Sequence, residues 1–164
     1  MVKGCLFCDS YSQWERDGLL LNSNRGAYSI LSVTPATPGS VIVVPKKHLL
    51  AKPRLMDLID ICQMINSGTL AKDQIERMVR ERPGELVRVY ERLVENPPFS
   101  EAGEYAQEML EWFLPGEDRV LGWNVGINIG EAAGQSQEHF HVHLVPRYGP
   151  TNQGVVKAFR NEFL

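Results

Sequence analysis

The chain lacks several features that would assign it to a special class of protein. It has only three cysteines and four histidines in 164 residues, too few cysteines for the disulfide framework of a small secreted domain. The formal net charge of −3 gives no basic field, and neither nucleic acid nor an anionic membrane is expected as a partner. No apolar run approaches the roughly 20 residues of a membrane helix, and the first residues lack the apolar core of a signal peptide. A cytoplasmic protein is therefore expected.

The apolar pattern predicts a single domain over residues 1–164. Segments rich in β-branched and aromatic residues predict strands at 26–33, 40–45, 120–128 and 139–147. The region between the second and third of these segments has the period of helices instead. An order of strands, helices and strands favours the α+β class, with an antiparallel sheet and helices packed on it.

The helical region begins at Pro53, and Ser67-Gly68 is predicted to end its first helix. Three further helical patterns follow, and Pro83 separates the first from the second because proline can both stop a helix and open the next one. Residues from about 68 to 115 are predicted to be a helical insertion, since the flanking strands look like parts of one sheet.

Three of the four histidines occupy alternate positions in "HFHVHLV". Side chains alternate between the two faces of a strand, so these histidines are expected to share an exposed face while the residues between them face the core. They are His139, His141 and His143. Three interpretations stay open: a solvated polar face, a three-histidine metal site, and a site that divides metal binding, nucleophilic attack and anion binding. The outer two lie about 13 Å apart along a strand, which makes convergence of all three on one ion awkward.

The segment "GEAAGQS" comes directly before the histidines and consists mostly of small residues. Backbone N–H groups in such a loop can bind an anion, and the Gln135 amide and Ser136 hydroxyl add donors. Its glycines also suit an ordinary hairpin loop. Beside a histidine face, the loop favours a phosphate site, where a neutral imidazole is a good nucleophile.

These segments resemble the motifs of the histidine triad family. "HFHVHLV" fits its pattern of histidines and apolar residues, "GSVIVVPKKH" looks like its "PGHxLVxPKxH" segment, and "GINIGEAAGQS" resembles its loop before the triad. The motifs occur in family order, and the resemblance covers about 1–67 and 120–150. It implies the family's α+β fold and a homodimer built around a long helix and the sheet.

The same resemblance implies a nucleotide hydrolase or nucleotidyl transferase. The substrate would be a nucleoside phosphate, a phosphoramidate or a dinucleoside polyphosphate, and His141 would form a covalent nucleotidyl intermediate. His143 and Ser136 would be the other catalytic residues, both in contact with the phosphate. The expected substrate-binding residues are Asn128, Gly134, Gln135, Ser136, His143 and Ser32. The alternative is a nucleotide-binding or regulatory protein with little catalysis, whose insertion is a partner surface.

Two short segments add to this interpretation. Before "TP" the family carries an acidic or amide residue that binds the ribose, and the matching Ser32 is a shorter and weaker ligand.

The N-terminal "CLFC" resembles a zinc-binding subset of the family. That resemblance implies one structural zinc ion held by Cys5, Cys8, His48 and His139, a donor set that suits a closed tetrahedral site. A redox pair is the alternative for a Cys-x-x-Cys motif.

Overall fold

A five-stranded antiparallel sheet forms the centre of the protein in the computed structural model, which describes residues 4–50, 58–112 and 119–148. The strand order is β1-β2-β3-β5-β4, and each neighbouring pair is antiparallel. The strands are β1 (Leu20–Ser23), β2 (Ala27–Leu31), β3 (Val41–Pro45), β4 (Gly122–Gly126) and β5 (Val142–Arg147). The predicted α+β class with an antiparallel sheet is confirmed.

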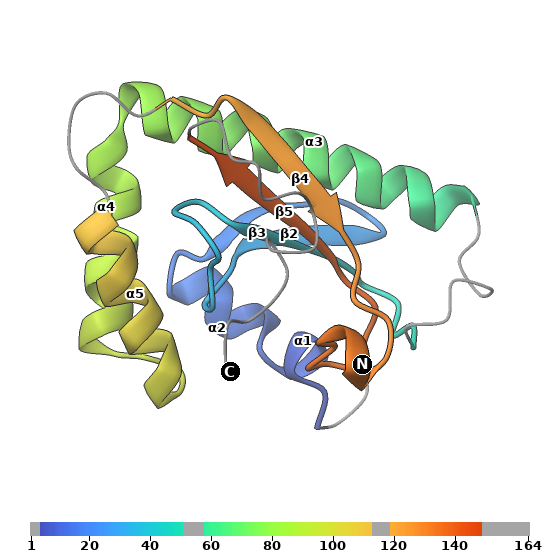
Figure 1. Ribbon diagram of the computed structural model, residues 1–164. Helices are drawn as coiled ribbons and strands as arrows, with labels where there is room; N and C mark the ends of the chain where they lie inside the picture. The colour runs from blue at the N-terminus through green and yellow to red at the C-terminus, as the bar shows by residue number, and fades with distance from the viewer. Residues whose placement is uncertain (1–3, 51–57, 113–118, 149–164) are drawn as a thin grey trace.

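Helices cover both faces of this sheet. They are α1 (Leu6–Asp9), α2 (Tyr11–Arg16), α3 (Leu58–Glu81), α4 (Pro83–Glu95) and α5 (Ser100–Trp112), and a short 3-10 turn, η2, spans Glu131–Ala133. Figure 1 shows α3 across one face of the sheet, α1 and α2 on the other side, and α4 paired with α5 at one end. None of the described helices combines the length and apolarity needed to cross a membrane.

The two central strands β2 and β3 are buried along their whole length. On one face, the Ser67 hydroxyl of α3 lies 2.7 Å from the Ser29 hydroxyl of β2. On the other face, the rings of Phe7 and Trp14 from the N-terminal helices pack together above Tyr28. Burial on both sides explains why "VIVV" in β3 is continuously apolar instead of alternating.

Helix α3 runs unbroken through Ser67 and Gly68, so the prediction that this pair ends a helix is wrong. The Ser67 hydroxyl also donates to Asn22 Oδ1 at 2.7 Å. A Cβ on Gly68 would lie 3.4 Å from a Leu144 methyl group, so the helix backbone sits close against the sheet there. The contacts that Ser67 and Gly68 make with the sheet stabilise the helix by more than their poor helix propensity costs. The predicted insertion would consequently start inside α3, and its last residues, 113–115, lie outside the described residues.

Candidate active site and metal centre

The histidine segment lies next to the sheet and only partly within it. Strand β5 begins at Val142, and His139 makes an isolated bridge to Leu50. His139 and His141 are 2% and 5% exposed, so the predicted exposed face of imidazoles is wrong for these two residues, while His143 is half-buried. The cause is Phe7 of α1, whose ring centroid lies 5.8 Å from that of His139 and 5.0 Å from that of His141.

The side chains of the histidine segment do alternate between the two faces of the sheet, as predicted. Phe140, Val142 and Leu144 line a groove on the α3 face of the sheet. His143 pairs with Ile42, which in turn lies in register with Ile30 through β2, so these side chains share the opposite face. The rings of His141 and His143 lie 4.8 Å apart between centroids. The structure therefore brings the second and third histidines into contact.

His141 has a defined tautomer. Its Nδ1 lies 2.9 Å from the carbonyl oxygen of His139, and a carbonyl can only accept, so Nδ1 carries the proton. Burial lowers the pKa of His141, which keeps the ring neutral and leaves Nε2 with a lone pair. That Nε2 makes no hydrogen bond to a described residue. A neutral imidazole oriented in this way is suited to nucleophilic attack.

His143 is also neutral at ordinary pH. Burial, followed by the interaction with His141, lowers its pKa to about 4. A protonated imidazole would attract a phosphate by its charge, but the lowered pKa of His143 disfavours that protonated state. A neutral ring can still donate one N–H group to a phosphate oxygen.

The loop after β4 is held by its own hydrogen bonds. Asn128 Nδ2 donates to the carbonyl of Gly134 at 3.3 Å, and Gln135 Oε1 accepts from the N–H of Gly130 at 2.6 Å. The N–H groups of Gly134 and Gln135 donate to carbonyls of the loop, at 2.8 Å and 3.3 Å. Ser136 is exposed and its hydroxyl makes no hydrogen bond with a described residue. Of the predicted phosphate ligands in this loop, only the Ser136 hydroxyl is unengaged.

Asn128 and Ser32, two of the predicted substrate-binding residues, lie at the ends of different strands. Gly126 pairs with His143, so the chain leaves β4 beside the histidine segment, and Asn128 follows two residues later. Ser32 follows β2 on the face that carries His143, but it is only 4% exposed. Its hydroxyl accepts a hydrogen bond from the N–H of Thr34 at 3.3 Å. The burial of Ser32 limits its reach as a ribose ligand.

Two cysteines and two histidines from distant parts of the chain converge beside α1. Cys5, Cys8, His48 and His139 place their ligand atoms within 4.8 Å of one another. Nδ1 of His139 lies 3.4 Å from Cys5 Sγ and 3.6 Å from Cys8 Sγ, and Nδ1 of His48 lies 3.4 Å from Cys8 Sγ. Zinc bonds of about 2.0 Å to nitrogen and 2.3 Å to sulfur require tetrahedral edges of about 3.5 Å between N and S. The cluster therefore has the chemistry and the spacing of a metal site.

The tautomer of His139 suits the same site. Its Nε2 donates to the carbonyl of Pro45 at 3.0 Å, which leaves Nδ1 with the lone pair that faces the two cysteines. Such an outer hydrogen bond commonly orients a metal-binding histidine. Among the described residues, neither His141 nor His143 joins a group that could hold a metal ion, which argues against the three-histidine metal site.

Phe7 is the residue that sequence reasoning missed. It is 4% exposed, packs on both buried histidines, and its carbonyl accepts a hydrogen bond from the Tyr28 hydroxyl at 2.7 Å. The sequence did contain one indication of this role, since an aromatic residue lies between the two cysteines of "CLFC". Phe7 connects the cysteine cluster to His141, because its ring lies against His139 and His141 at once.

Comparisons with known proteins point in one direction. The HIT domain family model matches residues 14–149. An AP-4-A phosphorylase of Mycobacterium tuberculosis (strain CDC 1551 / Oshkosh) is 26% identical over 136 residues, which are 82% of this chain and 49% of the relative. Protein hit of Bacillus subtilis (strain 168) is 32% identical over 108 residues, 65% of each chain. The chain thus spans about half the length of the phosphorylase it matches.

A solved structure shares the fold. It is a Zn-bound histidine triad family protein from Mycobacterium smegmatis, with a TM-score of 0.52 at 21% identity over 93% of this chain and 81% of the other. The family-model match begins after Cys5 and Cys8. The assignment of Cys5 and Cys8 to a metal site therefore rests on their position in the structure, and the family match does not include them.

Proposed function

Because the chain belongs to the HIT family, we propose that it is a nucleotide hydrolase or nucleotidyl transferase whose nucleophile is His141. The observation that carries the proposal is the hydrogen bond from Nδ1 of His141 to the His139 carbonyl. This bond directs the lone pair to Nε2, beside the ring of His143. The name of the AP-4-A phosphorylase relative supports a dinucleoside polyphosphate as the first substrate to test.

In the proposed reaction, Nε2 of His141 attacks the α-phosphorus of the substrate and the remaining phosphate chain leaves. The new N–P bond puts positive charge on the ring, and the His139 carbonyl stabilises this charge through the proton on Nδ1. Water or inorganic phosphate then attacks the same phosphorus and releases His141 as the neutral imidazole. A transient phosphoramidate of this kind divides one difficult displacement into two easier ones.

The other residues of the proposed site bind and position the substrate. His143 and the Ser136 hydroxyl donate to phosphate oxygens, and Asn128 fixes the loop through Gly134. Gln135 holds the loop closed with both ends of its amide, accepting from Gly130 N–H and donating to the Gln137 carbonyl. Ser32 contacts the ribose weakly, and broad selectivity for the sugar is expected from it.

One observation favours a second candidate function. His141 is only 5% exposed, and a buried nucleophile has a narrow approach for substrate. A nucleotide-binding or regulatory protein with little catalysis would tolerate this burial. Under this alternative, the pocket binds nucleotide and the helical segment contacts a partner.

We also propose that the Cys5, Cys8, His48 and His139 cluster holds one structural zinc ion. Its spacing fits a tetrahedral ion, and the M. smegmatis protein of the same fold is Zn-bound. A four-ligand site of this kind leaves no open position for a substrate. The metal would fix α1, and with it Phe7, against the histidine segment.

A homodimer is the proposed assembly. Helix α3 exposes Leu58, Ile59, Ile61 and Ile65, and the segment in and after β4 exposes Val125, Ile127 and Ile129. Between them lies an apolar groove of about 420 Å³ lined by Ile61, Ile65, Val125 and Ile127. Contiguous apolar patches of this kind are typical of interfaces. We call these seven residues the apolar α3/β4 face.

The proposed activity is tested by incubating the zinc-loaded protein with diadenosine tetraphosphate or adenosine 5′-phosphoramidate, with and without inorganic phosphate. We expect release of a mononucleotide, and a loss of at least about a thousandfold in rate for His141→Asn. Equal rates for the two proteins would contradict the proposal. Nucleotide binding by calorimetry without turnover of either substrate would establish the binding alternative instead.

A further inference from the structure

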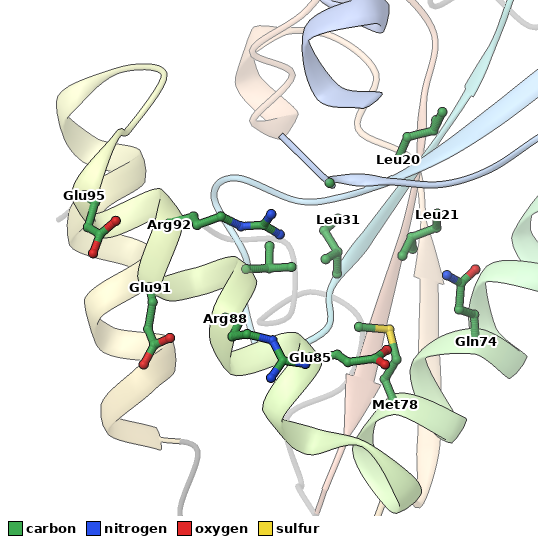
Figure 2. Close-up of a pocket in the computed structure, with 12 residues that line it drawn as sticks. Leu20, Leu21, Leu31, Gln74, Met78, Glu85, Arg88, Glu91, Arg92 and Glu95 are labelled. Carbon is green, nitrogen blue, oxygen red and sulfur yellow. The ribbon is translucent and has the colours of Figure 1, made fainter. Parts of the chain in front are cut away.

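A pocket of about 550 Å³ lies away from the histidines and cysteines, at the β1 edge of the sheet. Figure 2 shows it between the β1–β2 edge on one side and helices α3 and α4 on the other. It shares no residue with the candidate active site or with the cysteine cluster. Its volume is in the range of pockets that bind small molecules.

The floor of this pocket is apolar. It is built by Leu20 and Leu21 of β1, Leu31 of β2, Met78 of α3 and Val89 of α4. Leu31 is fully buried and Met78 and Val89 are nearly so, which leaves Leu20 and Leu21 as the main accessible apolar surface of the floor. An apolar group that covers this surface gains about 25 cal/mol per Å² of area removed from water. A purely polar ligand such as a sugar would leave that gain unused.

Two arginines one turn apart on α4 form the pocket rim. A Cβ on Gly18 would lie 2.8 Å from Nη2 of Arg92, so the guanidinium rests directly against the backbone of the turn before β1. Gly18 has a φ of +73°, which a side chain rarely permits. Arg88 lies four residues before Arg92, on the same side of the pocket (Figure 2). Neither arginine forms an ion pair with a residue in the described ranges.

Three glutamates also line the pocket, but they leave both guanidinium groups available. Glu85 is bound by Arg82, with 2.8 Å between nitrogen and oxygen. In Figure 2, Glu91 and Glu95 lie on the side of α4 that is turned away from Leu20, Leu21 and Leu31. In the same view, the side chain of Arg92 extends from α4 toward Leu31.

We propose that this pocket binds an amphipathic anion, a small molecule with an apolar body and one carboxylate or phosphate group. The apolar body would cover the floor, and the anionic group would accept hydrogen bonds from Arg92, whose guanidinium lies against Gly18. The guanidinium of Arg88 lies toward Gly84 in the first turn of α4 and would add positive potential at the rim. Guanidinium groups bind both carboxylate and phosphate with paired N–H donors. The site would be independent of nucleotide turnover, because it shares no residue with the proposed active site.

The test is calorimetric titration of the full chain with four eight-carbon probes: octanoate, octyl phosphate, octanol and octylammonium. We expect octanoate or octyl phosphate to bind with a dissociation constant below about 1 mM, and the tighter of the two identifies the anionic group. Octanol and octylammonium should bind at least about tenfold more weakly. The hydroxyl of octanol accepts from Arg92 without an opposite charge, and the ammonium group has no acceptor and is repelled by the guanidinium. Amide chemical shifts of Gly18 and Leu31 should move during the same titration.

Arg92→Gln should weaken binding of the anionic probe about tenfold, while Arg80→Gln on α3 should leave it unchanged. Arg80 is a matched control because it is an exposed arginine that does not line the pocket. A second variant, Gln74→Trp, fills the pocket from the α3 side and should abolish binding of every probe. The proposal is overturned if no anionic probe binds at millimolar concentration, if octanol binds as tightly, or if Arg92→Gln and Arg80→Gln behave alike.

Discussion

At the scale of single residues, backbone carbonyls assign different chemistry to neighbouring imidazoles. The Pro45 carbonyl accepts from Nε2 of His139, and the His139 carbonyl accepts from Nδ1 of His141. The first bond presents Nδ1 of His139 to the cysteines, and the second leaves the lone pair of His141 on Nε2. Two residues of one type, two positions apart, therefore offer opposite ring nitrogens.

The cysteine cluster gives the first prediction. Cys8→Ser should reduce bound zinc from one ion per chain to nearly none, and it should lower the melting temperature by about 10 °C, because a structural site contributes several kcal/mol to folding. Metal analysis and thermal unfolding measure the two effects. Cys62→Ser is the matched control, since Cys62 is an exposed cysteine outside the cluster and should change neither value. Full zinc occupancy in the Cys8 variant would refute the proposed site.

The pH dependence of stability provides a prediction for His143. Its pKa falls from 6.5 to about 4 on folding because burial disfavours the cation. Between these values the unfolded chain binds the extra proton, so the stabilisation is fully present above about pH 6.5 and declines as the pH falls toward 4. His143→Gln should remove up to about 1.4 kcal/mol per pH unit from the slope of unfolding free energy in this range. Urea unfolding of both proteins at about pH 7 and about pH 5 measures it. Parallel curves would mean that His143 is not held neutral.

At this scale the sequence predicted residue types better than residue environments. The spacing of Cys5 and Cys8, together with the family resemblance, identified the cluster that the fold assembles. Exposure of His141 was predicted wrongly, because strand alternation says which residues share a face but not what covers that face. Phe7 covers it, from a helix of only four residues that carries too little periodicity to be predicted.

At the scale of elements, α3 and the N-terminal segments show where local patterns mislead. Ser67 and Gly68 predict a helix end when propensity alone is considered, yet both lie inside α3 and pack closely against the sheet. Tertiary packing overrides propensity here. Strand β1 has four residues and a break in register between Leu20 and Asn22, and it showed no clear alternation in the sequence. Strands β2, β3 and β4 and helix α4, which opens at Pro83, were predicted correctly, whereas the strand predicted at 139–147 begins only at Val142.

Helix α4 is tied to the turn before β3 by one buried hydrogen bond. The Tyr90 hydroxyl, in a fully buried side chain, accepts from the N–H of Gly39 at 2.7 Å. Tyr90→Phe should lower the free energy of unfolding by about 1–3 kcal/mol, because it leaves a buried donor unsatisfied. Tyr11→Phe is the matched control: its hydroxyl bonds to Ser23 at an exposed position, where water can replace the partner. Chemical denaturation measures both, and equal losses would contradict the assigned role of Tyr90.

At the scale of the whole molecule, the apolar α3/β4 face is the surface that we propose as the dimer interface. Leu58, Ile59 and Ile65 are 74%, 70% and 64% exposed, and exposed apolar surface of this kind is typical of interaction sites. Ile65→Glu should convert the proposed dimer into a monomer, because it buries a charge at the centre of the interface. Light scattering after size exclusion measures the mass. Val94→Glu, an apolar residue of α4 outside this face, should leave the dimer intact. A wild-type monomer at micromolar concentration would refute the assembly.

The covalent intermediate is the most direct test of the central claim that His141 is the nucleophile. The wild-type protein is mixed with excess diadenosine tetraphosphate and quenched within milliseconds in alkaline denaturant, which preserves a phosphoramidate. Mass spectrometry of the intact chain and of its peptides follows. We predict that the protein gains one nucleoside monophosphate group, on the peptide that contains residues 139–143 and at Nε2 of His141. An unmodified protein during active turnover, or a label on another residue, would contradict it.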